Sequence, residues 1–411
     1  MPVDFRRIPS KTVVPEFPQW SVTKWAVLFV AIVGGGAALA LYTWPASQPT
    51  NTPWFWVRIV GYPLLAWVFI WSTTLAGAHT LRSVASAKNE VSERHELACH
   101  AQASMPLALL GHALRFSTDD AENNAQAVVG GQVQMVARTS AAFPKSATTS
   151  RWIAIPEKPF YPGNELSEHF RHEVITERLI DDLVARLRGD LGRLPSGTCV
   201  RVRSVVASSL ASEEVCADIG EKLRGWFPGL SVVMSKDTDA LSLFNVDAWA
   251  DGLWQNEIQL LVAIQLRRAI SEELPEGSAE AGVALLVGPP CDHTSIPTAL
   301  HLHRPATGNA TSASEISALA TRWGRSKGTD ISVVWSDALT DGAIAQLRST
   351  GVASDSAIWI DLRRTIGDCG HAAPWLGVAL AAEQAAQTAS PQLVVAQEGD
   401  QIIALVCRTQ S

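Results

Sequence analysis

The sequence predicts two membrane-spanning helices followed by an α/β body in which one order of strands and helices occurs twice. Three observations lead to this fold class. Two runs of 20 residues near the start carry no charge. Strand-like apolar segments alternate with helix-like amphipathic segments in the rest of the chain. Only 18% of the 411 residues are charged, below the roughly 25% of a typical soluble chain, so part of the protein is expected to lie outside water.

The uncharged runs are residues 25–44 and 59–78. At about 1.5 Å per residue, a helix of this length crosses about 30 Å of hydrocarbon. Tryptophan is concentrated around them, since seven of the 15 tryptophans lie in the first 80 residues, and aromatic rings favour the headgroup layer. A cleavable signal peptide has a shorter apolar core and is not followed so closely by a second span. We therefore expect both runs to contact the lipid bilayer.

Lysine and arginine are distributed unevenly around the two spans. They occur before the first span and after the second, whereas the connector 45–57 has neither: Arg6, Arg7, Lys11 and Lys24, then Arg82, Lys88 and Arg94. The positive-inside rule then places the connector outside and both termini and the main domain in the cytoplasm, here at a bacterial inner membrane. Six scattered cysteines without a CxxC pair fit a reducing compartment.

The expected organisation has five parts with different tasks. They are a cytoplasmic tail at 1–24, two transmembrane helices with a short external connector at 25–80, a linker helix at 81–104, and α/β halves at 105–290 and 291–411. Residues 1–100 carry a net charge of +3 and the remainder −10. Because phosphate binding needs clustered cations, the acidic body argues against nucleic acid as a partner.

In the first half, apolar strand-like segments alternate with helical periodicity. The expected strands are 107–116, 133–137, 199–206, 230–234, 258–266 and 282–287. The expected helices are 165–188, 212–226 and one within 238–254, and Ser212 is expected to cap the second of them. On the first helix, Glu168 with His172 and His169 with Glu173 have i,i+4 spacing, which is typical of a solvated helix face.

The second half repeats this order. Its expected strands are 299–303, 331–335, 357–362, 393–396 and 401–407, and its expected helices are 312–324, 341–349 and 372–387. Each half therefore reads β-α-β-α-β-α-β-β. Strands that alternate with helices indicate a largely parallel sheet with helices on its faces, and the last two strands add an antiparallel pair.

This duplicated order resembles the thiolase-like fold of thiolases and β-ketoacyl synthases over roughly residues 105–411. The segment 366–377, Ile-Gly-Asp-Cys-Gly-His-Ala-Ala-Pro-Trp-Leu-Gly, looks like the Gly-His-containing turn of ketoacyl synthases. The resemblance implies that His371 corresponds to a histidine of that family, with Arg363 or Arg364 near its usual lysine.

The sequence departs from the family at two of its three catalytic positions. The resemblance implies a nucleophilic cysteine before the third helix of the first half, where this chain has Ser235 as the only replacement and no evident base beside it. It also implies a His-Gly-Thr motif after the second strand of the second half, where residues 335–342 read Trp-Ser-Asp-Ala-Leu-Thr-Asp-Gly. We therefore expect a non-catalytic body, in which His371 caps or packs and Ser235 is the other candidate catalytic residue.

One short segment contains a cluster of possible metal ligands. Cys291, His293, His301 and His303 lie within 13 residues, and the last two share a strand face. Zinc sites need four matched ligands with outer hydrogen bonds, so histidines at a strand edge without a metal are the expectation. The sequence has no HExxH, GxSxG, P-loop or GxGxxG pattern, and no cofactor is expected.

Two functions from different classes fit these features. The first is a membrane-anchored, non-catalytic scaffold or adaptor, because an anchor raises the effective concentration of a domain near membrane partners. Its architecture is similar to the type VI secretion lipase-adaptor family, whose members escort effectors to the secretion machine, although no motif carries that resemblance and the sequence names no protein partner. The alternative is a membrane-bound enzyme of thiolase-like fold acting on acyl or lipid substrates. A cleft with His371 and a perturbed ionisable neighbour favours the enzyme, whereas a filled space between Ser235, Trp335 and His371 favours the adaptor.

Overall fold

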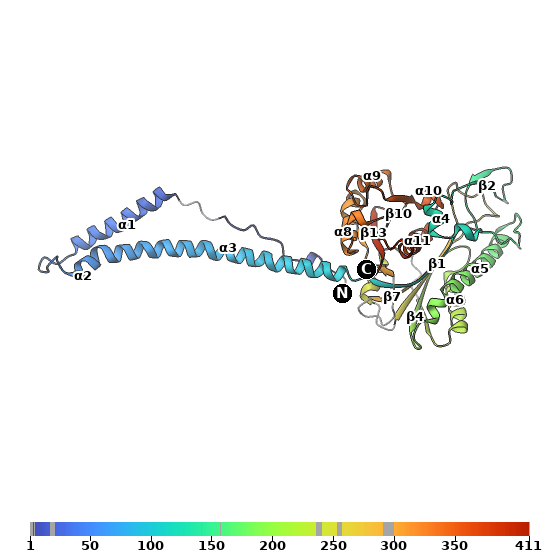
Figure 1. The fold of residues 1–411 in the computed structure, drawn as a ribbon, viewed down its shortest axis with the longest axis horizontal. Coiled ribbons are helices and arrows are strands. Elements are labelled where there is room, and N and C mark those ends of the chain that lie inside the picture. Colours follow the sequence, from blue (N-terminus) through green and yellow to red (C-terminus); the bar gives the residue numbers. More distant parts are fainter. Residues whose placement is uncertain are drawn as a thin grey trace. The chain divides into compact units, whose positions relative to one another are not determined.

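The computed structural model describes residues 3, 5–16, 21–140, 142–156, 158–235, 241–252, 257–290 and 300–410. The chain forms two compact units, one of residues 4–99 and one that contains residues 100–411. Figure 1 shows a helical hairpin in the first unit and a large sheet covered by helices in the second.

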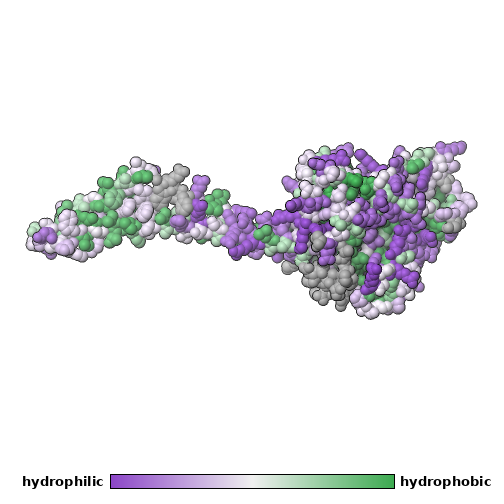
Figure 2. Space-filling view, in the orientation of Figure 1, coloured by the Kyte–Doolittle hydropathy of each residue, from purple (hydrophilic) through white to green (hydrophobic). Residues whose placement is uncertain are grey.

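The first unit is a helical hairpin. Its helices are α1 (Val22–Tyr42), α2 (Pro53–Trp56) and α3 (Tyr62–Ala103), with a π-helical turn at Val57–Gly61 between the last two. Both arms are long and apolar enough to cross a membrane, and only 6% and 11% of their apolar windows are buried. Figure 2 shows hydrophobic side chains along the surface of this unit. The apolar residues of both arms therefore lie mostly at the surface of this unit.

Small and aromatic residues hold the two arms of the hairpin together. At Gly36 of α1, a Cβ atom would come within 2.7 Å of the Pro63 ring of α3, so this close approach requires glycine. Trp67 of α3 meets Phe29 and Trp25 of α1 edge-on, with ring centroids 5.1 and 6.3 Å away. Edge-on packing suits the charge distribution of aromatic rings and adds direction to otherwise non-directional apolar contacts.

The segment before α1 packs along the polar part of α3. Asn89 Nδ2 donates to the carbonyl oxygen of Thr12 (2.9 Å), and Ser92 Oγ donates to that of Pro9 (2.6 Å). The Lys11 ammonium lies 3.3 Å from a carboxylate oxygen of Glu96. The residues that precede the first arm and those that follow the apolar part of the second therefore lie together, at one end of the hairpin.

The described strands of the body, except β2 and β3, form one sheet. They are β1 (Leu107–Arg115), β4 (Cys199–Ala207), β5 (Ser231–Met234), β6 (Glu257–Gln265), β7 (Ala281–Pro290), β8 (Leu300–Leu302), β9 (Ala306–Asn309), β10 (Val333–Asp337), β11 (Ile358–Asp361), β12 (Gln392–Glu398) and β13 (Gln401–Thr409). Their order is β11-β10-β12-β13-β8-β1-β7-β6-β4-β5, and β9 lies beside β13.

The strand order repeats within this sheet. The order β5-β4-β6-β7-β1 at one end corresponds to β11-β10-β12-β13-β8 at the other. In each part three neighbouring strands are parallel, namely β5, β4 and β6 or β11, β10 and β12, and the next strand, β7 or β13, is antiparallel to them. The two parts meet at a short antiparallel pairing of β1 with β8, in which Leu107 lies opposite Leu302.

The helices of the body form three layers. They are α4 (Ala125–Val129), α5 (Glu165–Gly192), α6 (Ser212–Trp226), α7 (Asn245–Gly252), α8 (Ala313–Trp323), α9 (Asp341–Ser349), α10 (Leu362–Thr365) and α11 (Ala373–Thr388), and β2 (Ala137–Thr139) with β3 (Ala147–Thr149) forms a separate hairpin. Helices α5 and α6 cover β1, β7, β4 and β5, while α8 and α9 belong to the other outer face and α8 packs on β13 and β9. Between them, α11 contacts β1 and β7 on one side and β10, β12 and β13 on the other.

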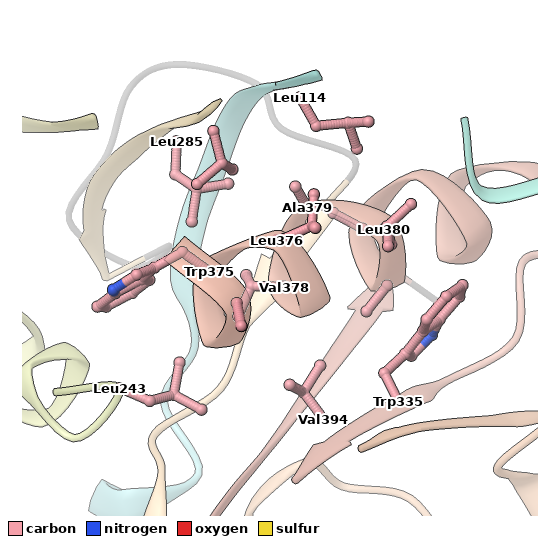
Figure 3. Close-up of a cluster of buried hydrophobic side chains, with 14 of the residues drawn as sticks. Leu114, Leu243, Leu285, Trp335, Trp375, Leu376, Val378, Ala379, Leu380 and Val394 are labelled. Atoms are coloured by element: carbon pink, nitrogen blue, oxygen red, sulfur yellow. The ribbon is translucent and has the colours of Figure 1, made fainter. Parts of the chain in front are cut away.

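The composition of α11 explains its central place. All ten residues from Ala373 to Ala382 are buried, and most of them are alanine, glycine or valine. Small side chains allow the two parts of the sheet to approach both faces of one helix, and alanine also has the highest helix propensity. The larger Trp375, Leu376 and Leu380 fill the remaining space (Figure 3).

Two local predictions were wrong. The strand expected at 133–137 begins only at Ala137. Ser212 is the first residue of α6 and not its cap, because the capping position is taken by Ala211 without a side-chain hydrogen bond. The helix expected within 238–254 is present and spans Asn245–Gly252, while residues 236–240 and 253–256 lie outside the described residues.

Candidate functional site

The candidate site lies where the parallel strands of the second part of the sheet end. Strand β10 ends at Asp337 and β11 at Asp361, and the short α10 then leads into the turn at 366–372 before α11. The carboxyl ends of parallel strands are the usual place for ligands in α/β folds, because the connecting loops meet there. The turn contains His371, one of the residues that the sequence analysis singled out.

The turn is fixed to the loop before β7. The backbone N–H of Asp368 donates to the carbonyl of Gly277 (2.6 Å), and that of Ala279 donates to the carbonyl of Asp368 (3.0 Å). Gly367 has a φ of 116°, and a Cβ there would come within 2.6 Å of the Ala279 side chain. Glycine is therefore required at this position both by the backbone conformation and by the space.

Arg267 and Asp368 connect the two parts of the body. The Arg267 guanidinium donates to the carbonyl of Asp368 (2.8 Å) and lies 3.4 Å from its carboxylate. The same carboxylate accepts the backbone N–H of Gly370 (3.0 Å), whose φ is 50° and whose Cα faces the Gln265 side chain too closely for a Cβ. These contacts hold the backbone of the turn, so the position of His371 is determined by its neighbours.

His371 itself lies on the surface. Its side chain is exposed, and the structure gives its imidazole no hydrogen bond or ion pair with another described residue. The preceding Cys369 is buried, and burial raises the pKa of its thiol far above the ordinary value, so this cysteine is held as a neutral thiol. The turn thus presents an exposed histidine beside an unreactive thiol.

Asp337 is the most unusual ionisable group near the turn. It is only 7% exposed, and its Oδ1 has no hydrogen-bond partner among the described residues. Burial raises the pKa of Asp337 to about 6, against the opposing effect of Arg363, whose Nε lies 3.8 Å from Oδ1, and with a further contribution from nearby carboxylates. A carboxyl group with such a pKa exchanges a proton near neutral pH, which is a property of many catalytic acids and bases.

The described neighbour of the Ser235 hydroxyl is an arginine side chain. Ser235 follows β5, its backbone N–H donates to the carbonyl of Val202 (2.8 Å), and its hydroxyl lies 3.5 Å from a guanidinium nitrogen of Arg203. A guanidinium cannot accept the hydroxyl proton, so Arg203 cannot act as the base that a serine nucleophile needs. Residues 236–240, which follow Ser235, lie outside the described residues.

The described residues just before α7 include two buried apolar side chains. Leu241 and Leu243 are buried, at 7% and 0% exposure. The indole nitrogen of Trp375 donates to the carbonyl of Leu241 (3.2 Å), and a carboxylate oxygen of Glu398 accepts the N–H of Leu243 (2.9 Å). Figure 3 shows Trp375 on the side of α11 that faces Leu243.

Trp335 fills the other side of α11. Its side chain is fully buried in the middle of β10, near Leu380 and Val394 (Figure 3). The segment that precedes α7 and the strand that leads to Asp337 therefore contribute large apolar groups to the central layer, not reactive ones.

The candidate metal ligands are only partly described. Cys291 and His293 lie outside the described residues. The rings of His301 and His303 have centroids 6.4 Å apart, and burial lowers the pKa of His303 to about 3, so its ring is neutral. Among the described residues, no group of three histidine, cysteine or acidic side chains could hold a metal ion.

Charged residues of α5 form a buried network that the sequence did not predict. Glu168 and His172 of α5 were expected on a solvated face, but each is only 2% exposed. Arg171 between them donates to both carboxylate oxygens of Glu280 (3.0 and 2.7 Å), and Glu280 also accepts the N–H of Arg267 (2.8 Å). The prediction of a solvated helix face is therefore wrong for Glu168 and His172, because i,i+4 spacing is equally compatible with a buried network.

Comparison with known proteins shows a similarity of fold. No family model matches the sequence, and no curated protein matches it. Among solved structures, the PfaC keto synthase–chain length factor aligns with a TM-score of 0.50 at 12% identity, over 75% of this chain and 43% of its own. The body has a thiolase-like fold. At this identity the likeness extends to the fold alone.

Two further structures align over similar lengths. The ishigamide ketosynthase/chain length factor has a TM-score of 0.48 at 13% identity, over 75% of this chain and 100% of its own. The ketosynthase from module 6 of the bacillaene synthase of Bacillus subtilis 168 has a TM-score of 0.49 at 11% identity, over 74% of this chain and 71% of its own.

Proposed function

We propose that this chain is a membrane-anchored, non-catalytic scaffold or adaptor, whose thiolase-like body recruits partner proteins at a bacterial inner membrane. The observation that carries this proposal is the buried apolar packing just before α7. Leu241, Leu243 and Trp375 are buried there, and the backbone is held by the Trp375 indole and the Glu398 carboxylate. A condensing enzyme needs an accessible nucleophile at the N-terminus of this helix.

The membrane part of the proposal is supported by the hairpin. Its apolar side chains are exposed over most of both arms, which is costly in water and favourable in lipid. The contacts of Asn89 and Ser92 with Thr12 and Pro9 bring both flanks of the hairpin to one end, as expected if both lie on the same side of a bilayer. The lysines and arginines of these flanks favour the cytoplasmic side.

The narrower form of the proposal is delivery of type VI secretion effectors. In this form, the body recruits effectors in order to escort them to the secretion machine. The combination of a short helical anchor with a large acidic α/β body supports it. Affinity capture of the tagged full chain from membranes tests this form: co-purification of a secreted effector or a component of the secretion machine supports it, and capture of neither contradicts it.

A second candidate function is supported by Asp337. A buried carboxyl group with a pKa of about 6 at the end of β10, next to the turn of His371, favours an enzyme for acyl or lipid substrates. In that case Asp337 would exchange the proton, and the exposed His371 would contact the substrate.

One assay separates the two functions. The purified full chain in neutral detergent is incubated with an acyl thioester and release of free thiol is followed. The scaffold proposal expects release no faster than with empty micelles. Release by the native chain that is lost in Asp337→Asn or His371→Ala, but kept in the surface variant His169→Ala, would establish the enzyme instead.

A further inference from the structure

A groove runs between α5 and α6 on the outer face of the body. It has a volume of about 520 Å³. The two helices are tied together at this groove by the ion pair of Lys222 on α6 with Asp181 on α5. The groove is far in sequence from the turn of His371, and none of the residues of that turn lines it.

The rim of the groove is strongly acidic. Glu173 and Glu177 of α5 and Asp218 and Glu221 of α6 line it, and all four side chains are exposed. None of the four forms an ion pair with another residue in the described part of the chain. Lys222 is the one cation lining the groove among the described residues, and Asp181 already neutralises it. The groove therefore carries four uncompensated negative charges.

The floor of the groove is apolar, with one unsatisfied polar group. Ile180, Leu210 and Val215 line it, and Trp226 at the end of α6 lies beside them with 43% of its surface exposed. Thr176 also lines the groove and is only 3% exposed, yet its hydroxyl has no hydrogen-bond partner among the described residues. A buried hydroxyl without a partner is unfavourable, and a polar atom of a bound ligand would satisfy it.

We propose that the groove between α5 and α6 binds a basic amphipathic helical segment of a partner protein. Lysine or arginine side chains of the segment would face Glu173, Glu177, Asp218 and Glu221, and its apolar face would cover Ile180 and Trp226. This is the helix-in-groove mode of recognition, in which apolar anchors supply affinity and rim charges supply specificity and rate. The inference rests on the scaffold proposal and names the chemistry of the recruited partner. An acidic rim repels nucleic acid and anionic lipid, which excludes both as occupants.

The test uses a defined probe. A fluorescein-labelled helical peptide of lysine and alanine, with a pair of leucines one turn apart, is titrated with the full chain in neutral detergent, and anisotropy is corrected for empty micelles. We expect Glu177→Lys with Asp218→Lys to weaken binding by about tenfold or more, since each lost factor of ten corresponds to only about 1.4 kcal/mol. Trp226→Ala is expected to weaken it as well, through loss of an aromatic anchor.

The matched control reverses the same number of charges outside the groove. Glu213→Lys with Glu214→Lys changes two exposed carboxylates in the first turn of α6, which do not line the groove. This control is expected to weaken binding less than the groove variant does, because neither carboxylate lines the groove and exposed charges outside a binding site contribute little. Absence of peptide binding by the native chain, or equal weakening in both double variants, overturns the inference.

Its failure can be told apart from failure of the scaffold proposal. If the peptide does not distinguish the groove variants while the full chain still captures proteins from membranes, the groove inference is wrong and the scaffold proposal stands. If thioester turnover dependent on Asp337 or His371 is found, the scaffold proposal is wrong whatever the peptide does.

Discussion

Trp249 of α7 and Trp375 of α11 stack on each other, with ring centroids 5.6 Å apart and ring planes inclined by 21°. Both side chains are buried, at 5% and 0% exposure. The pair joins two helices of the central layer that are more than 100 residues apart in sequence. Aromatic packing thus links α7 to α11, the helix that follows the turn of His371.

Truncating either ring is expected to destabilise the body. Trp375→Ala or Trp249→Ala should each cost about 3–5 kcal/mol of unfolding free energy, because a large cavity is left in a close-packed layer. The double variant should cost less than the two single changes together, by about 1 kcal/mol, because the rings contact each other. Chemical unfolding of the full chain in detergent measures all three. Trp226→Ala, at a ring that is 43% exposed, is the control and should cost much less.

Removing the charge of Glu280 is expected to be as damaging. Glu280 is fully buried and accepts hydrogen bonds from the Arg171 guanidinium and from the backbone of Ile153 and Arg267. Glu280→Gln leaves the Arg171 cation without its main partner, at a cost of about 3–5 kcal/mol. The exposed Glu276→Gln is the matched change on the same loop. Equal unfolding free energies for the two variants would show that the buried pair contributes nothing.

The arrangement of strands and helices could be predicted because it depends on local patterns. The Ala-rich stretch before residue 388 has one strong propensity, and α11 forms there as expected. The hairpin of β12 and β13 turns at Gly399, whose φ of 62° suits glycine. The membrane orientation and the boundary between the two halves stay predictions.

The site could not be predicted in the same way, because burial is a property of the folded chain. Glu168 and Arg171 look like solvated charges in sequence, and only the distant Glu280 shows that they are not. In sequence, Asp337 is an ordinary polar residue near the end of a strand. The resemblance implies only that the His-Gly-Thr motif is missing there. The raised pKa of Asp337 comes chiefly from burial, against the opposing effect of Arg363, which lies 26 positions away in the sequence.

Asp337 should make stability depend on pH. Its pKa is raised from 3.8 to about 6 in the folded chain, so the folded state holds a proton that the unfolded state releases. Unfolding free energy should therefore fall as the pH rises from about 4 to about 6 and stay lower above it, by an amount on the order of 3 kcal/mol. Asp337→Asn cannot titrate, and its profile should lack this fall. Parallel profiles of the native chain and the variant between pH 4 and 8 would contradict the assignment.

His303 should give the opposite sign. Burial is the main cause that lowers the pKa of His303 to about 3. Between about pH 6.5 and pH 3, His303 is therefore protonated in the unfolded chain and neutral in the folded chain. Its contribution to stability is present above pH 6.5 and is lost as the pH falls toward 3. His303→Leu should reduce the acid sensitivity, measured by thermal melting between pH 4 and 7. The exposed His169→Leu is the control, and a loss of acid sensitivity in that variant instead would refute the role of burial.

The proposed topology predicts which residues a membrane-impermeant thiol reagent can reach in intact cells. Ser47 lies exposed in the connector between the arms of the hairpin, and Glu213 lies exposed on α6 of the body. A maleimide that cannot cross membranes should label Ser47→Cys in cells with a permeable outer layer, and should label Glu213→Cys only after the inner membrane is opened. The native chain, treated in the same way, gives the background labelling from the partly exposed Cys99 and Cys199. Because two spans must return the chain to the side on which it began, the two sites have to differ in accessibility if the hairpin crosses the bilayer. Labelling of both sites in intact cells, or of Glu213→Cys alone, would require the body to lie outside the cytoplasm.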